Sequence, residues 1–417
     1  MSYLEGAEGA EGAEGAEGAE GAEGAEGAEG AAQRARRSPV FALIAHRDGI
    51  AGSWDYQPTA WQSGEIPQTV GGPLSRWDTR IRRFVFESEL LSSLYFSIDA
   101  PMDGSPVPPG TTFSYEATLY SLLRPNTALG PSPPAGTWKP LISMLRPGDS
   151  IFAGQLVLMN GYADLRVDRA REIVAQMAPQ YAFWGSVVPL YPARHRYTIE
   201  LLGLVLRLAK YTEMSFKNAL CVRRPNEYSP QIQPILQTPI HGSLPSGHST
   251  EAHAVARVLH ALVSDPTKTL AQTQQLREQL MRQAHRIAIN RTVAGLHYPV
   301  DSMAGQLLGL TIGSYFVARA SAPLPSAGGS GYTTPATGSV EAWKFDGTQF
   351  NGLQDFTGSE IYDVVGDAVK VPVIKPPATK PFVARLTAPN VEVNYAPCLN
   401  WLWSAAKAEW YPATDRP

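Results

Sequence analysis

The strongest hydrophobic pattern of this chain is helical and lies in its middle third. Apolar residues recur three and four positions apart in five segments, a spacing that places them on one face of a helix. Shorter β-like runs, such as 84–86 and 94–98, occur earlier between proline- and glycine-rich connectors. The predicted helices are 165–177, 199–220, 249–263, 270–289 and 299–317. We therefore predict an all-α fold class, a helical-bundle core with irregular N- and C-terminal extensions.

Changes in composition divide the chain into four parts. Residues 1–37 hold nine Glu-Gly-Ala repeats and an arginine-rich linker. The repeat contains no proline, which argues against a collagen-like run, and it stacks like charges, so we expect a disordered acidic tail. Residues 38–150 are predicted to form an irregular or helical extension and 151–325 the catalytic helical core. A second glycine-, serine- and proline-rich stretch then introduces a C-terminal appendage at 326–417.

The net charge of the chain changes from negative to positive when the repeats are left out. The chain has 35 basic and 38 acidic residues, and nine of the acidic ones are the repeat glutamates, which leaves 29 in the rest. That remainder is mildly basic but shows no nucleic-acid-binding motif, so no nucleic-acid partner is expected. The two cysteines, Cys221 and Cys398, form neither a disulfide framework nor a zinc pattern.

No segment has the pattern of a membrane span. The best candidate, 303–318, is interrupted by Gln306 and bounded by Asp301 and Arg319, and it is too short to cross ~30 Å of hydrocarbon. The N-terminus lacks the layout of a signal peptide. We expect no membrane span, and the cytoplasm is the default location.

Two clusters of polar residues have the right chemistry to hold an anion. Lys217 and Arg224 flank a predicted helix end, where a point charge and a planar bidentate donor can face one cavity. The second cluster, 245–248, precedes a helix, so Ser246, Gly247 and His248 lie where backbone N–H groups and the helix dipole favour anions. Taken alone, the first is compatible with surface charge and the second with an ordinary helix cap.

A third cluster adds another cation and a histidine. Arg291 and His297 are followed by Asp301, which suggests a helix end, a loop and a new helix beginning near Pro299. Asp301, one turn into that helix, can accept from Nδ1 of His297 and leave Nε2 available as a ligand or nucleophile. The three clusters together suit a tetrahedral oxyanion such as phosphate or vanadate.

The order of these clusters resembles the signature of one enzyme superfamily. It joins type 2 phosphatidic acid phosphatases (PAP2) and bacterial class A acid phosphatases to vanadium-dependent haloperoxidases. The resemblance covers roughly 151–320, with Asn290 where the family often has serine. It implies that His297 is the metal ligand and His248 the acid–base group. The oxygens of vanadate, the implied cofactor, would be held by Lys217, Arg224, Ser246, Gly247 and Arg291.

Two further positions resemble the haloperoxidases that oxidise bromide and iodide. His241, seven residues before His248, matches their second histidine, and Met214 stands where chloroperoxidases have tryptophan. The resemblance implies a vanadate-dependent haloperoxidase that uses hydrogen peroxide to oxidise bromide or iodide, with vanadium as a Lewis acid. A small organic acceptor would receive the halogen. We expect the extensions to mediate a homo-oligomer.

Two alternatives remain open from the residues. In a soluble PAP2-type acid phosphatase, His297 would attack phosphorus and His248 would protonate the leaving alcohol. In a non-enzymatic scaffold, the tail and the appendage would carry the function. Asp164 and Asp168 either pair with Arg291 or lie on an exposed helical face.

Overall fold

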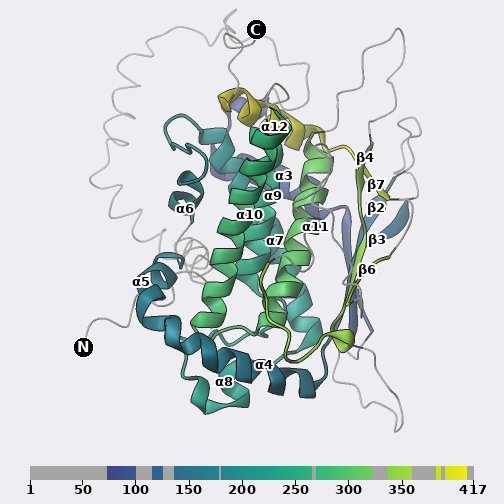
Figure 1. Cartoon of the computed structure of the whole chain (residues 1–417). Coiled ribbons are helices and arrows are strands. Elements are labelled where there is room, and N and C mark those ends of the chain that lie inside the picture. The colour runs from purple at the N-terminus through teal and green to yellow at the C-terminus, as the bar shows by residue number, and fades with distance from the viewer. Residues whose placement is uncertain are drawn as a thin grey trace, which may run out of the picture.

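A bundle of helices lies beside a mixed β-sheet in this protein (Figure 1). The computed structural model describes residues 73–99, 115–124, 136–177, 180–264, 269–321, 337–358, 382–386 and 390–410. The predicted acidic tail, 1–37, lies outside the described residues.

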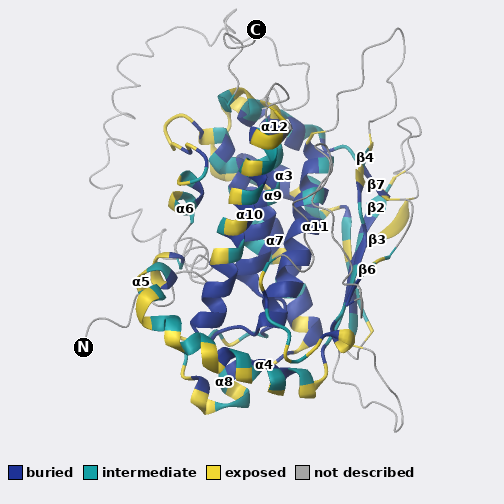
Figure 2. Cartoon of the chain, viewed as in Figure 1, coloured by how far each residue is buried: buried dark blue, intermediate teal, exposed yellow. Residues whose placement is uncertain are grey.

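Four long helices form the centre of the bundle. They are α7 (Arg196–Leu220), α9 (Gly247–Val263), α10 (Leu270–Val293) and α11 (Pro299–Ala320). Each matches a predicted range to within a few residues, since the apolar positions that defined the range are the ones that pack inward (Figure 2). The remaining predicted helix, 165–177, is a short 3-10 turn, η3 (Ala163–Leu165), continued by α5 (Arg166–Ala175).

Helices α9 and α11 approach one another closely because glycines on α11 leave no side chain between them. A Cβ added to Gly305 would lie 2.6 Å from the carbonyl oxygen of Ser246. One added to Gly309 would lie 2.3 Å from that of Thr250. The N-terminus of α9 is therefore fixed against the first turns of α11.

Shorter helices cover the two ends of the bundle (Figure 1). At the end where α7 and α10 finish lie α4 (Asp149–Tyr162), α5 and α8 (Pro225–Tyr228). At the opposite end lie α3 (Thr79–Leu91) and α12 (Pro397–Trp410), while α6 (Tyr181–Gly185) precedes α7. Short 3-10 turns occur at η2 (Pro73–Arg76), η4 (Pro230–Ile232) and η5 (Gly347–Gln349).

The C-terminal helix α12 is tied to the bundle by charged side chains at two helix ends. Glu409 accepts hydrogen bonds from the backbone N–H groups of Tyr197 at 2.8 Å and Thr198 at 2.9 Å, in the first turn of α7. Lys407 Nζ donates to the carbonyl oxygen of Leu262 at 2.8 Å, at the end of α9. Each charge has the sign that complements the dipole of the helix it touches.

The predicted all-α fold class is wrong, because the structure is mixed α/β. Its main sheet has the order β1-β2-β3-β5-β6, and β4 and β7 form a second sheet. Strand β3 pairs in parallel with β5, joining Ile142 to Trp343. Because β3 and β5 are far apart in the sequence, the local pattern of neither strand predicts that the two pair. The strands are β1 (Leu94–Ile98), β2 (Glu116–Leu123), β3 (Thr137–Leu145), β4 (Thr337–Val340), β5 (Trp343–Asp346), β6 (Val383–Arg385) and β7 (Val391–Asn394).

Two local expectations for the N-terminal region had different outcomes. The β-like run 94–98 is strand β1, whereas 84–86 lies inside helix α3. None of the described helices combines the length and the continuous apolar sequence needed to cross a lipid bilayer.

Candidate active site

Lys217 reaches the site from the last turn of α7. The helix ends at Leu220 because Cys221 adopts a left-handed conformation, with φ of 46°. The Lys217 side chain is only 2% exposed, and its Nζ donates to the carbonyl oxygen of Gly242 at 3.2 Å. A buried ammonium is thus fixed against the loop that leads into α9.

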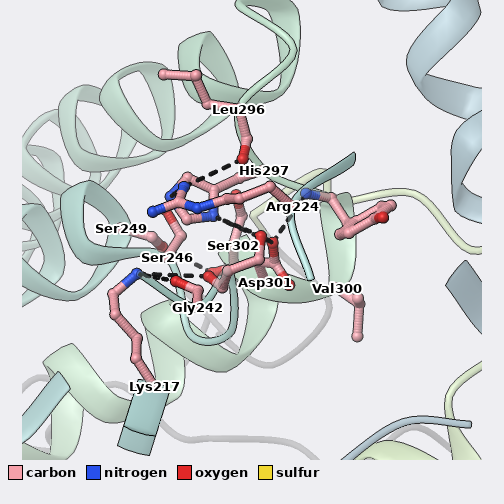
Figure 3. A network of polar contacts seen from close by, with 12 residues as sticks. Lys217, Arg224, Gly242, Ser246, Ser249, Leu296, His297, Val300, Asp301 and Ser302 are labelled. Atoms are coloured by element: carbon pink, nitrogen blue, oxygen red, sulfur yellow. Dashed lines mark hydrogen bonds and ion pairs between the residues drawn. The ribbon is translucent and has the colours of Figure 1, made fainter. Parts of the chain in front are cut away.

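Arg224 joins three loops through one guanidinium group. It is the N-cap of α8, where Pro225 fixes the first helical position. Its Nε donates to the carbonyl oxygen of His241 at 3.0 Å, and its Nη1 donates to that of Leu296 at 3.2 Å. Nη1 also lies 3.0 Å from Nε2 of His297. Figure 3 shows Lys217, Arg224, Ser246 and His297 converging on one small volume.

The ring of His297 is oriented by Asp301, in the first turn of α11. Nδ1 of His297 lies 3.1 Å from Oδ2 of Asp301. The same carboxylate oxygen accepts hydrogen bonds from the Ser243 hydroxyl and, at 3.0 Å, from the backbone N–H of Tyr298. A carboxylate on Nδ1 and an arginine donor on Nε2 assign the proton to Nδ1. Nε2 therefore carries the lone pair that a ligand or electrophile needs.

Burial and neighbouring charge keep His297 neutral. Its pKa lies well below the usual value because the ring is desolvated and because Arg224 and Lys217 repel a second proton. Burial raises the pKa of Asp301, although the hydrogen bonds from Ser243 and Tyr298 act in the opposite direction. A neutral imidazole is the form that can attack phosphorus or bind a metal.

The residues at the start of α9 provide hydrogen-bond donors. Ser246 is the N-cap, and its backbone N–H donates to the carbonyl oxygen of Asp301 at 2.9 Å. Its hydroxyl is buried and has no hydrogen-bond partner among the described residues. Gly247 opens the helix, and His248 follows with 9% of its surface exposed. The first-turn N–H groups and a buried hydroxyl thus face the cationic side chains.

Arg291 approaches from the last turn of α10. Its Nη2 donates to the carbonyl oxygen of Ile173 and to Oε1 of Gln176, each at 3.0 Å. Its Nη1 lies 3.5 Å from the sulfur of Met177. The last turn of α5 and the two residues after it therefore orient this guanidinium. Asp164 and Asp168 lie exposed, as the surface alternative expected.

His241 belongs to the wall of the site. Its ring is half-buried, and its Nδ1 lies 3.2 Å from Nη2 of Arg224. Met214, three residues before Lys217 on α7, is also half-buried. The structure therefore brings Arg224, His241 and His297 into direct contact around one guanidinium.

Sequence reasoning missed three residues of the site. Ser243 and Gln176 carry polar side chains in segments without a motif, so they left no signal. Glu213 could have been found from the sequence, since it is a charged residue on the inward, apolar face of α7. It is 1% exposed and lies against Gly247.

The donor set fits a tetrahedral oxyanion. Lys217 and Arg224 supply positive charge near His297, whose Nε2 carries a lone pair, and Ser246 supplies a buried hydroxyl that lacks a partner among the described residues. Arg291 is a further buried cation, held at the end of α5. The described residues contain no cluster of three or more His, Cys, Asp or Glu suited to a metal cation. Vanadate and phosphate, which share geometry and charge, fit this set equally well.

One family model matches the segment that holds the site. The sequence model of the PAP2 superfamily matches residues 199–322, the segment that contains every side chain named in the three motifs. A crystal structure of a transmembrane PAP2-type phosphatidylglycerolphosphate phosphatase from Bacillus subtilis is similar at 19% identity. The match covers 39% of this chain and 79% of that one, with a TM-score of 0.25. The search of curated proteins gave no match.

Proposed function

Because residues 199–322 form a domain of the PAP2 superfamily, we propose that this protein hydrolyses phosphate monoesters through a phosphohistidine at His297. The observation that supports the proposal is the environment of that ring. Nδ1 is held by Asp301 at 3.1 Å, and Nε2 lies beside a guanidinium at 3.0 Å. The nucleophilic nitrogen therefore lies beside a cation that would hold the oxygens of a bound phosphoryl group.

In the first step, Nε2 of His297 attacks phosphorus and the bond to the ester oxygen breaks. His248, the more exposed histidine, donates the proton that the leaving alcohol needs. Lys217, Arg224 and Arg291 stabilise the charge on the three equatorial oxygens. Asp301 stabilises the positive charge that develops on the imidazole, since it already accepts from Nδ1.

In the second step, water attacks the phosphohistidine and the bond between phosphorus and nitrogen breaks. His248 now accepts the proton from that water, which restores both histidines. The products are the alcohol and inorganic phosphate, and no further reactant is required.

Phosphate release from an aryl phosphate tests the proposal. His297→Ala is expected to abolish release, and His248→Ala to slow the second step so that phosphate accumulates on the protein. A labelled protein band that His297→Ala lacks would identify the nucleophile. His195→Ala, at the far end of α7, is the matched control and should keep its activity. Undiminished release by the His297→Ala protein would exclude this mechanism.

A second candidate is the vanadate-dependent haloperoxidase, and the position of His241 favours it. Its ring contacts Arg224, and the resemblance to bromide- and iodide-oxidising enzymes puts a second histidine at this position. His297 would bind vanadium, and the same cations, Ser246 and Gly247 would hold its oxygens. When bound, vanadate would supply Lewis-acid activation of hydrogen peroxide.

The haloperoxidase ranks second because an oxidisable side chain lies beside Arg291. The thioether of Met177 lies 3.5 Å from the guanidinium, and a hypohalite-like oxidant formed there would convert it to the sulfoxide. Halogenation of a dione by the vanadate-loaded protein, measured beside phosphate release, separates the two functions. Halogenation without phosphate release would reverse the ranking.

A further inference from the structure

One carboxylate lies inside the cationic site without belonging to any of its motifs. Glu213 is on α7, one helical turn before Lys217, and only 1% of it is exposed. A Cβ added to Gly247 would lie 2.6 Å from its Oε1 and 3.2 Å from its Oε2. The carboxylate thus abuts the first residue of α9, at the helix end that the oxyanion would occupy.

Counting the buried charges shows why this carboxylate matters. In the oxyanion site of the proposed function, the buried side chains of Lys217, Arg224 and Arg291 contribute three positive charges, and those of Glu213 and Asp301 contribute two negative ones when ionised. The site then carries a net charge of +1, from three positive less two negative. Without the charge on Glu213 it would carry +2, which matches a phosphate dianion. Mismatched charge in a buried site is strongly unfavourable because little water screens it.

We propose that Glu213 sets the charge state in which the site accepts an oxyanion. Binding of a doubly charged phosphate is coupled to the uptake of one proton from solvent by the Glu213 carboxylate. The protonated carboxyl no longer repels the anion and becomes a hydrogen-bond donor next to Gly247. This inference rests on the oxyanion site of the proposed function and adds the residue that selects the charge of its ligand.

Other charged and titratable groups face Glu213 and set how strongly it holds its charge. On its own helix, Lys210 Nζ lies 3.8 Å from Oε1, and Lys217 follows one turn later. From α9, His248 follows the glycine that the carboxylate touches. The Lys210 side chain is 22% exposed, so water screens its attraction for the carboxylate. Water screens the repulsion between the carboxylate and a bound anion less, because the anion would lie in the buried site.

Calorimetric titration with inorganic phosphate tests the inference without relying on catalysis. The wild type and Glu213→Gln are compared at about pH 8, where phosphate is the dianion, and at about pH 6, where much of it is the monoanion. Glu213→Gln should bind phosphate at least about tenfold more tightly at the higher pH. This advantage should shrink at the lower pH, because the monoanion carries one charge less and the site with ionised Glu213, at +1, already matches it. Glu278→Gln, which changes the net charge equally on α10, should behave as the wild type.

The outcomes separate this inference from the proposed function. Equal affinities of the wild type and Glu213→Gln at both pH values would overturn the role of Glu213 and leave the phosphate site intact. Weaker binding by Glu213→Gln would also overturn it, since the carboxylate would then position Lys217. Failure of the wild type to bind phosphate would overturn both proposals.

If Glu213→Gln does not fold, a measurement on the wild type decides. Phosphate binding is titrated at about pH 8 in two buffers that differ in ionisation enthalpy. The difference in heat gives the number of protons taken up. Uptake of about one proton per phosphate supports the inference, and no uptake overturns it.

Discussion

The Oδ2 atom of Asp301 lies 3.1 Å from Nδ1 of His297. Asp301 belongs to helix α11, whereas His297 belongs to the loop before it. Their separation of four positions spans the helix start at Pro299. The backbone N–H of Tyr298 binds the same oxygen at 3.0 Å. The helix start therefore fixes both the carboxylate and the ring that it orients.

Replacing Asp301 tests this orientation. Asp301→Asn keeps the shape of the side chain but loses its charge, so the imidazolium-like charge formed during attack is less stabilised. We expect kcat for phosphate release to fall by about 10- to 100-fold with little change in KM. Steady-state kinetics on an aryl phosphate measures both, and an unchanged kcat would contradict the assigned role.

Adding one methyl group at Gly247 tests the close approach of Glu213. Gly247→Ala would place Cβ 2.6 Å from Glu213 Oε1, so either the buried Glu213 carboxylate or the first turn of α9 must shift. We expect phosphate affinity to fall by at least about tenfold, because a displaced anion site loses aligned donors. Isothermal titration with phosphate measures this loss.

Gly203→Ala is the matched control for that change. A Cβ at this position of α7 would meet no atom within 4 Å. We expect unchanged phosphate affinity and a gain in stability of about 0.5–1 kcal/mol, since alanine has the higher helix propensity. Equal loss of affinity in both variants would show that any perturbation of the bundle disturbs the site.

The contact between His241 and Arg224 predicts an effect of His241 on substrate affinity. His241→Ala removes the ring that lies 3.2 Å from Nη2 of Arg224, and the guanidinium gains freedom. We expect KM for the phosphate ester to rise several-fold with a smaller change in kcat. In the haloperoxidase alternative the same change alters the ratio of bromide to iodide oxidation. Unaffected kinetics in both assays would remove His241 from the site.

One buried histidine, His253, and two half-buried ones, His260 and His285, predict loss of stability in acid. Burial lowers the pKa of His253 to about 3, and the pKa values of His260 and His285 to about 4. The unfolded chain, with histidine near 6.5, binds protons first as the pH falls. Stability is therefore full above about pH 6.5 and falls below it, by up to about 1.4 kcal/mol per pH unit for each ring. Denaturant unfolding between about pH 7 and about pH 4.5 measures this slope.

His253 provides the control for the acid effect. Its Nδ1 lies 2.7 Å from the carbonyl oxygen of Ser249 and its Nε2 lies 3.2 Å from Nε2 of Gln306. His253→Gln retains hydrogen-bonding capacity but cannot titrate. The slope of stability against pH should decrease by the contribution of one group, and an unchanged slope would mean that His253 is not responsible.

The sequence by itself determined the central helices and the chemical identity of the candidate site. Apolar periodicity predicts α7, α9, α10 and α11, because burial of one helical face leaves a signal within each segment. Local spacing placed the polar clusters at helix ends, and the resemblance of their order to the PAP2 signature identified the residues of the site. These residues are Lys217, Arg224, Ser246, Arg291 and His297. The loop before Pro299 was likewise predicted from the local sequence.

Only the tertiary structure decided the fold class and the electrostatic surroundings of the site. The pairing of β3 with β5 joins distant segments, so neither strand reveals its partner from local periodicity. Gln176 and Ile173 hold Arg291, and Glu213 lies against Gly247, because packing brings separate helices together. Local patterns encode which groups are present. Burial and long-range packing decide which of them meet and which charge each can carry.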